Sequence, residues 1–142
     1  MTDGKLIDSN ILVYAFDQYD EEKRDAASKI ISSLIEKGEI VFSVQNLSEF
    51  FVIATKKIDR PIPLENAKNI IIKFAKLPNV KIFPIHSQTI IKAIGISETY
   101  SLSYWDALIA SVMQENNVNS IITENDKDFR KIPWIKVTNP FK

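Results

Sequence analysis

The sequence predicts an α/β domain in which a central, mostly parallel and twisted sheet of four or five strands is covered by helices on both faces. Two observations support this prediction. Short apolar runs alternate along the chain with longer segments of helical apolar periodicity. The chain has 142 residues, 45% of them hydrophobic, and no internal repeat, low-complexity tract or linker. A chain of this size can bury its own core, so we expect residues 1–142 to form a single domain.

The elements expected in the first half of the chain follow from apolar spacing and from residues that stop helices. Residues 21–38 carry apolar side chains on one helical face and end at Gly38, the residue type that most often closes a helix. The RPIP segment at residues 60–63 interrupts the pattern, because proline lacks the amide hydrogen that a helix interior requires. We therefore expect strands at residues 5–8 and 39–44 and helices at residues 10–16, 21–38, 46–57 and 64–77.

The second half continues the alternation. Residues 104–117 are apolar nearly all round, which indicates a helix buried in the core. We expect strands at residues 80–85, 120–123 and 134–140, the last at the sheet edge, and helices at residues 87–100 and 104–117. Sheets of this type bind ligands beyond the carboxyl ends of their strands.

Composition excludes several kinds of site. Lys and Arg total 18, as do Asp and Glu, so the formal net charge is zero and no bulk basic surface for nucleic acid is expected. With no cysteine and a single histidine, His86, the chain lacks disulfides, thiolate zinc sites and paired catalytic histidines. Its three glycines form no dinucleotide-binding or phosphate-binding loop. We find no signal peptide or membrane span and expect a cytoplasmic protein.

Acidic residues fall where the predicted strands end. Asp8 ends the first strand, and Glu49 lies in the first turns of the helix after the second strand. Asp106 lies in the first turn of the helix at residues 104–117, and the ENDKD segment, residues 124–128, follows the fourth strand. Since the carboxyl ends of parallel strands meet at one edge of a sheet, we expect these carboxylates to converge.

Each carboxylate also has an ordinary structural interpretation. Asp8 could cap the following helix, and both NLSE at residues 46–49 and SYWD at residues 103–106 match the capping-box pattern. The TENDKDF segment could be a polar turn. However, the helices that carry Glu49 and Asp106 are apolar nearly all round and are expected to be buried, where an unpaired carboxylate is costly.

Converging carboxylates require compensation. Two carboxylates about 4 Å apart repel by roughly 4 kcal/mol at an effective dielectric constant of about 20. A cluster of three or four is tenable only with raised pKa values or a bound cation, and Mg²⁺ and Mn²⁺ prefer oxygen ligands. The acidic residues thus indicate a carboxylate metal site, which commonly supports phosphoryl chemistry.

Four segments resemble the motifs of the PIN domain family. They are LIDSNILVYAF, SEFFVIA, YWDALIASV and IITENDKDF, in this order and at PIN-like separations over essentially the whole chain. Length and layout are most similar to the VapC-type toxins of prokaryotic toxin–antitoxin pairs. The resemblance implies a three-layer α/β/α fold and a ribonuclease that binds Mg²⁺ or Mn²⁺ and cleaves RNA with activated water.

The resemblance also implies roles for single residues. Asp8, Glu49 and Asp106 match the first three acidic positions of the family. Ser9 and Asn10 match the small polar positions that hold the first carboxylate and the water. Glu49 would complete the metal shell or orient the attacking water.

The fourth acidic position is ambiguous. Counting forward from Thr123 gives Asn125, whereas counting back from Phe129 gives Asp126, with Asp128 following. We favour Asp126, while Asn125 would keep an oxygen ligand but lose a charge. The predicted catalytic residues are therefore Asp8, Glu49, Asp106 and Asp126, and the predicted metal ligands are Asp8, Asp106 and Asp126.

Basic residues beside these motifs are expected to form a rim for the RNA phosphates. They are Lys127, Arg130 and Lys131 next to the fourth motif and Lys56, Lys57 and Arg60 after the second, although solvated helix ends would have the same composition. We assign no role to His86 or to the aromatic residues Tyr14, Tyr104, Trp105 and Trp134.

The leading interpretation is a Mg²⁺- or Mn²⁺-dependent endoribonuclease toxin, held inactive by a protein antitoxin that covers the acidic cleft. One alternative is a PIN nuclease of RNA processing without an antitoxin. Another is a catalytically weak PIN module that binds RNA or protein. PIN toxins resemble one another in forming dimers, so we expect a homodimer, with the Ile-rich residues 67–74 as one candidate for its interface.

Overall fold

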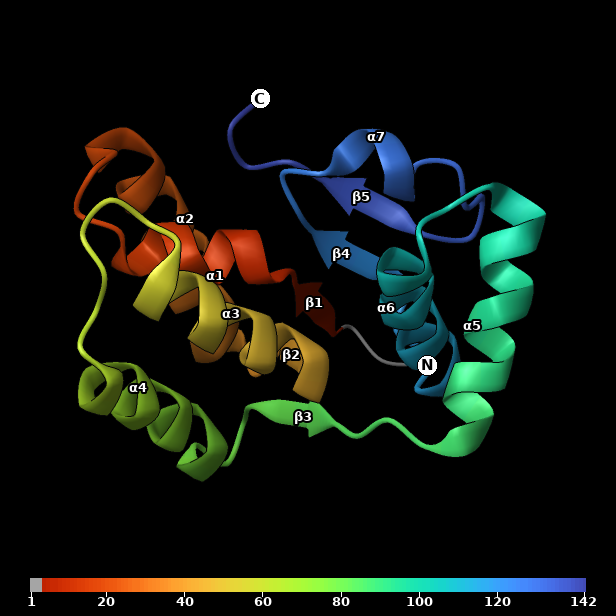
Figure 1. Cartoon of the computed structure of the whole chain (residues 1–142), viewed down its shortest axis with the longest axis horizontal. Helices are drawn as coiled ribbons and strands as arrows, with labels where there is room; N and C mark the ends of the chain where they lie inside the picture. The colour runs from red at the N-terminus through yellow and green to blue at the C-terminus, as the bar shows by residue number, and fades with distance from the viewer. Residues whose placement is uncertain (1–3) are drawn as a thin grey trace.

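The chain forms a five-stranded sheet flanked by helices in a computed structural model that describes residues 4–142 (Figure 1). The strand order is β3-β2-β1-β4-β5, and every strand pairing in this part of the chain is parallel. The predicted α/β class with a largely parallel sheet is thereby confirmed. The strands are β1 (Lys5–Ile7), β2 (Ile40–Ser43), β3 (Lys81–Phe83), β4 (Ser120–Ile122) and β5 (Lys136–Thr138).

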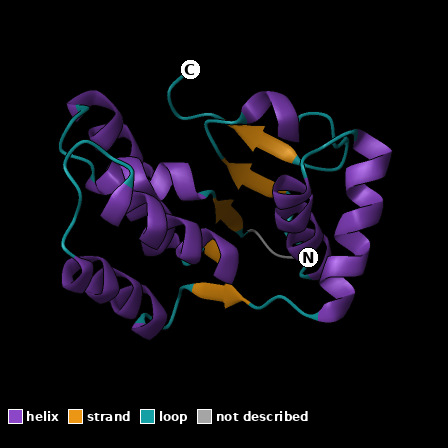
Figure 2. Cartoon of the chain, in the orientation of Figure 1, coloured by secondary structure: helices purple, strands orange, loops and turns teal. Residues whose placement is uncertain are grey.

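Helices cover both faces of the sheet, which gives the three layers visible in Figure 2. Alternate residues of a strand point to opposite faces, so each central strand serves two cores. Ile7, Phe42 and Ile122 pack in the first core, and Leu6, Val41 and Ile121 pack in the second. The first core is covered by α1 (Ser9–Phe16), α2 (Glu21–Lys37), α3 (Val44–Lys56) and α4 (Leu64–Lys76), and the second by α5 (Ser87–Tyr100), α6 (Tyr104–Glu115) and α7 (Asp126–Phe129).

Strand order creates one place where the connections diverge. β1 lies between β2 and β4. The strands that follow β1 in sequence are therefore added first on one side of it, as β2 and β3, and then on the other side, as β4 and β5. Ligand sites of open α/β sheets form at such a divergence, beyond the carboxyl ends of the strands. In this chain, that position lies between the end of β1 and the end of β4.

The start of α3 differs from the prediction. The strand was expected to continue through Val44 and the helix to be capped at Asn46, but β2 ends at Ser43 and α3 begins at Val44. Ser43 accepts a hydrogen bond from the Asn46 amide, and the Asn46 side chain accepts one from the Ser43 amide. The reciprocal pair caps the helix three residues earlier than the NLSE pattern suggested, because Asn46 occupies the third helical position of the box.

Of the two helices that were expected to be buried on all sides, only one is. Residues 107–113 of α6 are buried, as predicted. In α3, however, Val44 is 38% exposed and Val52 is 44% exposed, so the prediction of a fully buried helix was wrong there. Val44 and Val52 line a surface pocket together with Ile71 of α4. None of the helices within residues 4–142 has the length and apolar character needed to cross a membrane.

Candidate functional site

Asp8 lies at the carboxyl end of β1, where it caps α1. Its Oδ1 accepts a hydrogen bond of 2.8 Å from the Ser9 amide. Its Oδ2 accepts one of 2.8 Å from the Thr123 hydroxyl and a longer one of 3.4 Å from the Asn10 side chain. The side chain is buried, and every one of these donors is neutral. The predicted cap and the predicted roles of Ser9 and Asn10 as neighbours of the first carboxylate therefore have a geometric basis.

The electrostatics of Asp8 connect it with two other predicted residues. Burial is the largest influence and raises the pKa of Asp8 from 3.8 to about 6. Hydrogen bonds from Thr123 and Ser9 oppose this rise, and the negative charges of Glu49 and Asp106 add to it. The charges of Glu49 on α3 and Asp106 on α6 thus both act on Asp8 at the end of β1.

Asp106 lies in the first turn of α6, where Ser103 is the N-cap. The Ser103 side chain accepts a hydrogen bond from the Asp106 amide at 3.2 Å, which is one of the two bonds of the capping box that SYWD suggested. The Asn125 side chain donates to Asp106 Oδ2 at 3.1 Å. Partial burial is the main reason that the pKa of Asp106 is raised, and the charge of Asp128 raises it further, whereas hydrogen bonds with Ser103 and Asn125 lower it. Asn125 and Asp128 therefore both lie beside the third acidic residue.

Glu49 is half-buried on α3, one turn after Gln45. The Gln45 side-chain nitrogen donates to Glu49 Oε2 at 3.3 Å and to the backbone oxygen of Trp105 at 3.0 Å, which ties α3 to the start of α6. Gln45 Oε1 is buried and has no hydrogen-bond partner within the described residues. A buried acceptor left unpaired costs about 1–3 kcal/mol, so this amide is unusual.

The loop after β4 is held in place from two sides. The Glu124 amide donates to Asn10 Oδ1 at 3.3 Å, and the Asn125 amide donates to Thr123 Oγ1 at 2.9 Å. The Glu124 carboxylate accepts hydrogen bonds from the Tyr14 hydroxyl at 2.8 Å and from Lys23 at 2.5 Å. Sequence reasoning gave no role to Glu124, Tyr14 or Lys23, because more than 100 residues separate Glu124 from either partner.

Asp126 contacts the C-terminal tail and the residue that closes α7. Its Oδ1 accepts a hydrogen bond from Asn139 at 3.3 Å, and its Oδ2 lies 3.6 Å from both Arg130 and Lys142. Burial alone would raise the pKa of Asp126, but the hydrogen bond from Asn139 and the charges of Lys142 and Arg130 hold it below its usual value. The side chain that reaches Asp106 from this loop is Asn125, the other candidate for the fourth position.

The basic residues expected at the rim are partly engaged. Arg130 pairs with Asp126, and Lys131 lies 3.9 Å from Asp128 and donates to the Ser101 backbone oxygen. Lys127 is exposed and forms no salt bridge within residues 4–142. The remaining predicted cations are exposed around the end of α3: Lys56, Lys57 and Arg60.

The residues at this edge fit a hard divalent cation in their chemistry. Asp8, Glu49, Asp106 and Asn125 offer carboxylate and amide oxygens, which Mg²⁺ and Mn²⁺ prefer. No salt bridge within residues 4–142 reaches Asp8, Glu49 or Asp106. Binding would require the side chains to draw closer, since no three His, Asp or Glu side chains in this part of the chain already form a group able to hold an ion.

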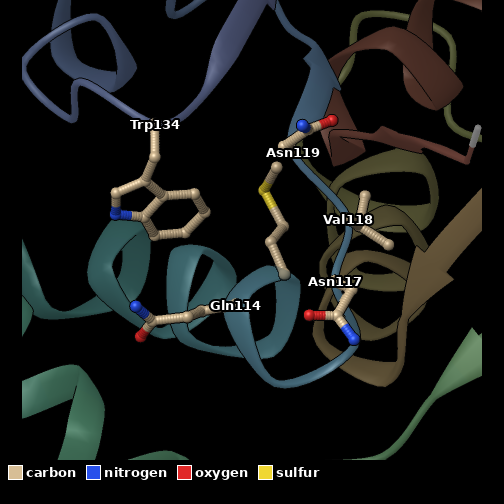
Figure 3. A pocket seen from close by; sticks show the side chains of 6 residues that line it. Gln114, Asn117, Val118, Asn119 and Trp134 are labelled. Atoms are coloured by element: carbon tan, nitrogen blue, oxygen red, sulfur yellow. The ribbon is translucent and has the colours of Figure 1, made fainter. Parts of the chain in front are cut away.

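A pocket of about 370 Å³ at the opposite edge of the sheet is chemically different (Figure 3). It lies at the amino-terminal ends of β4 and β5 and contains Trp134, one of the aromatic residues left without a role. Its lining includes no carboxylate, so it cannot supply the chemistry predicted for the acidic edge. The lining residues are Met113, Gln114, Asn117, Val118, Asn119 and Trp134.

Comparisons with known proteins agree with this description. A toxin–antitoxin complex from Klebsiella pneumoniae is 23% identical with a TM-score of 0.71, and the match covers 96% of this chain and 98% of that chain. DNA-bound VapBC from Salmonella typhimurium is 16% identical with a TM-score of 0.69 and 99% coverage of both chains. VapC20 from Mycobacterium tuberculosis, a Sarcin-Ricin loop cleaving toxin, is 11% identical with a TM-score of 0.69, covering 89% of this chain and 94% of that chain.

At these identities the likeness to solved structures establishes the fold. Comparison with curated protein sequences finds no match. A family model for the PIN domain matches residues 5–135, which is most of the chain and includes all four motifs. The chain therefore belongs to the PIN domain family.

Proposed function

We propose that this PIN domain is a Mg²⁺- or Mn²⁺-dependent endoribonuclease, and specifically the toxin of a toxin–antitoxin pair acting in the cytoplasm. The observation that carries the proposal is that buried Asp8, at the end of β1, lies within electrostatic range of Glu49 and Asp106, with no salt bridge to any of the three in the described chain. A carboxylate group of this kind is stabilised by a divalent cation, and such cations serve phosphodiester hydrolysis.

The chain's own residues would divide the work as follows. Asp8 and Asp106 hold the cation, and Thr123, Ser9 and Asn10 orient the Asp8 carboxylate through their hydrogen bonds. A bound divalent cation supplies positive charge at the scissile phosphate and lowers the pKa of a water molecule. Glu49, on the facing helix, completes the shell or orients the attacking water.

For the fourth position we propose Asn125 rather than Asp126. Asn125 contacts Asp106, and its amide oxygen can serve as a neutral ligand after rotation of the side chain. Asp128 supplies negative charge beside Asp106. Asp126 is already compensated by Arg130 and Lys142, so it has the least need of a metal.

The proposed partners are RNA, a protein antitoxin and a second copy of the chain. The similar structure from Klebsiella pneumoniae is a toxin–antitoxin complex, which supports an antitoxin as a partner of this chain. We propose that the antitoxin covers the acidic edge. The Ile-rich segment of α4, in which Ile72 is 37% exposed, is the proposed contributor to a homodimer. A PIN nuclease without an antitoxin and a catalytically weak binding module are the competing functions.

The test is cleavage of a mixed structured RNA by purified, antitoxin-free protein with Mg²⁺ or Mn²⁺, with EDTA as the chelated control. Cleavage is expected to disappear with EDTA and in Asp8→Ala and Asp106→Ala. Asp25→Ala is a matched control, because Asp25 is an exposed aspartate on α2 whose ion pair is with Arg24 of the same helix. Equal behaviour of all proteins, once folding is verified by circular dichroism, would refute the nuclease and favour a binding module.

Metal binding can be measured without RNA. Mn²⁺ at 100 times its dissociation constant should stabilise the fold by about 2.7 kcal/mol, because it binds the folded state. The corresponding rise in melting temperature should vanish in Asp8→Ala and Asp106→Ala and persist in Asp25→Ala. A rise that persists in all three variants would mean that the ion binds elsewhere.

A further inference from the structure

Three segments that are distant in sequence meet in a cluster of charged and polar side chains beside the acidic edge. Glu124, in the loop after β4, accepts hydrogen bonds from the Tyr14 hydroxyl of α1 at 2.8 Å and from the Lys23 ammonium of α2 at 2.5 Å. Lys23 also donates to the Tyr14 hydroxyl at 3.3 Å. We call these three residues the clasp, because they tie the loop after β4 to the first two helices.

The clasp differs from an ordinary surface ion pair because several groups hold its cation. An exposed pair usually contributes little, since two long side chains must be kept in one geometry. The Lys23 ammonium lies 4.7 Å from the centre of the Tyr14 ring and 5.2 Å from that of the Phe141 ring, within the range of cation–π attraction. The two rings pack edge to face, and hydrogen bonds with Glu124 and Tyr14 raise the pKa of Lys23. The ammonium therefore stays charged beside Glu124.

The loop that the clasp holds carries the neighbours of both proposed metal ligands. Thr123 directly precedes Glu124 and donates to Asp8 Oδ2 at 2.8 Å. Asn125 directly follows Glu124 and donates to Asp106 Oδ2 at 3.1 Å. Because consecutive residues are covalently joined, a displacement of Glu124 would disturb both contacts.

We propose that Lys23 and Glu124 are positioning residues: their ion pair holds the loop after β4 so that Asp8 and Asp106 keep the arrangement that binds the divalent cation. The inference rests on the proposed nuclease function and assigns a role to two residues outside the proposed cation shell. Removing a group that orients metal ligands typically costs roughly 10- to 100-fold in metal affinity or activity.

A positioning role differs in sign from a purely electrostatic one. If only the net charge near the site mattered, removing the charge of Lys23 would strengthen cation binding, and removing the charge of Glu124 would weaken it. If the ion pair positions the loop, both removals weaken cation binding, because each breaks the same contact. The direction of the Lys23 effect therefore separates the two roles.

The experiment compares Lys23→Met, Glu124→Gln and the double variant with wild type, after melting curves verify that they fold. Mn²⁺ affinity is measured by calorimetric titration without RNA, cleavage of structured RNA is measured with Mn²⁺, and RNA affinity is measured in EDTA by anisotropy of a labelled strand. Lys5→Met and Glu39→Gln are the matched controls. This ion pair, at 3.2 Å, is about as exposed as the clasp pair but lies at the amino end of β1 and directly before β2.

Each single variant of the clasp is expected to weaken Mn²⁺ binding by roughly 10-fold and to lower cleavage at subsaturating Mn²⁺ to a similar extent. The double variant should be no worse than either single variant, since both remove one ion pair. Lys23→Arg keeps the charge and should restore Mn²⁺ affinity to within a few-fold of wild type. RNA affinity in EDTA should not change, and the Lys5 and Glu39 variants should bind Mn²⁺ and cleave as wild type does.

Several results would overturn the positioning role. Stronger Mn²⁺ binding by Lys23→Met would mean an effect of charge alone, and a lower melting temperature with unchanged Mn²⁺ affinity would mean an ion pair that only stabilises the fold. Loss of RNA affinity in EDTA confined to Lys23→Met would make Lys23 an RNA contact. Metal-dependent cleavage that is equal in wild type and both variants would reject the positioning role while the nuclease stands. Weaker Mn²⁺ binding in both variants of a protein that never cleaves RNA would support the positioning role and reject the nuclease.

Discussion

Asp8 and Asp126 both lie near the carboxyl edge of the sheet, yet their surroundings are opposite. Asp8 is bonded by neutral donors, and burial together with neighbouring carboxylates raises its pKa to about 6. Asp126 lies 3.6 Å from each of two cations, Arg130 and Lys142, and its pKa is lowered. Both side chains are mostly hidden from solvent, but Asp8 lies the deeper of the two.

The difference shows which carboxylate has a negative charge that no neighbouring cation compensates. A buried charge is stabilised by pairing, by protonation or by a bound ion. Asp126 already has its pairing, and it fastens the C-terminal tail to α7. Asp8 has no salt bridge in the described chain, so a proton or a metal ion remains to compensate it.

The largest expected effect is on catalysis. Asp8→Asn should lower metal-dependent RNA cleavage by roughly 100-fold or more, the scale for loss of one preorganised electrostatic group. Asp126→Asn, the matched change, should leave the rate within a few-fold of wild type because Asp126 faces Asn139 and Lys142. Initial rates at equal concentrations of folded protein measure both. A comparable loss in Asp126→Asn would restore the fourth position that the sequence suggested.

The next effect is on stability and tests the compensation by protons. Because the folded pKa of Asp8 lies above its usual 3.8, the folded chain binds this proton more tightly than the unfolded chain does. The Asp8 contribution is therefore fully present below about pH 4 and is lost as the pH rises through about 6. Raising this pKa from 3.8 to about 6 corresponds to roughly 3 kcal/mol.

Urea unfolding of wild type and Asp8→Asn between pH 4 and pH 7 isolates this contribution, since other carboxylates titrate in both proteins. The difference in unfolding free energy should shift in favour of wild type as the pH falls. If the unfolding free energies of the two proteins changed with pH in parallel, the pKa of Asp8 would be the same in the folded and unfolded states. The comparison with Asp126 would then lose its electrostatic basis.

Part of the fold and of the acidic edge could be predicted from the sequence alone. The sheet could be predicted because apolar periodicity locates the strands, and Asp8 lies within reach of the charges of Glu49 and Asp106 because parallel strands present their carboxyl ends together. The tighter cluster that was expected is absent from residues 4–142, where no three acidic side chains form a group able to hold an ion. The family motifs added the same three positions. The apolar periodicity of the sequence was therefore enough to predict the position of a residue that directly follows a strand.

The direction of the side chains after β4 could not be predicted in the same way. Asn125 and Asp126 are adjacent, and which of them turns toward Asp106 depends on a single turn of helix and on Asn139, 13 residues later. The exposed stripe of α3 was missed for a related reason. Apolar composition indicates burial, but whether another element covers Val52 is decided by the packing of the whole fold.

A smaller effect sharpens the fourth position. Asn125→Ala removes the donor to Asp106 and a potential oxygen ligand, and should weaken metal binding by roughly 10-fold, the lower end for a supporting contact. Asn125→Asp should instead bind metal more tightly, while lowering metal-free stability at neutral pH by adding another carboxylate beside Asp106. Calorimetric titration with Mn²⁺ compares the variants. Unchanged affinity in both would exclude Asn125 from the site.

The smallest expected effect concerns the salt bridges of Asp126. Lys142→Gln removes one cation from Asp126 but leaves Arg130, so the melting temperature should fall by roughly 3 °C or less at low salt. Since the Lys142 side chain is exposed, added salt should screen the interaction and erase the difference. Lys127→Gln is the control, because Lys127 is exposed without a salt bridge in the described chain.

Cleavage by Lys142→Gln should match wild type, since Lys142 contacts Asp126 and no salt bridge or hydrogen bond given for Asp126 in residues 4–142 reaches Asp106. If cleavage fell strongly while the melting temperature stayed constant, Lys142 would be acting on the RNA. In that case the surroundings of Asp8 and of Asp126 would form one RNA-binding surface. The distinction between Asp8 as a metal ligand and Asp126 as a purely structural residue would then be wrong.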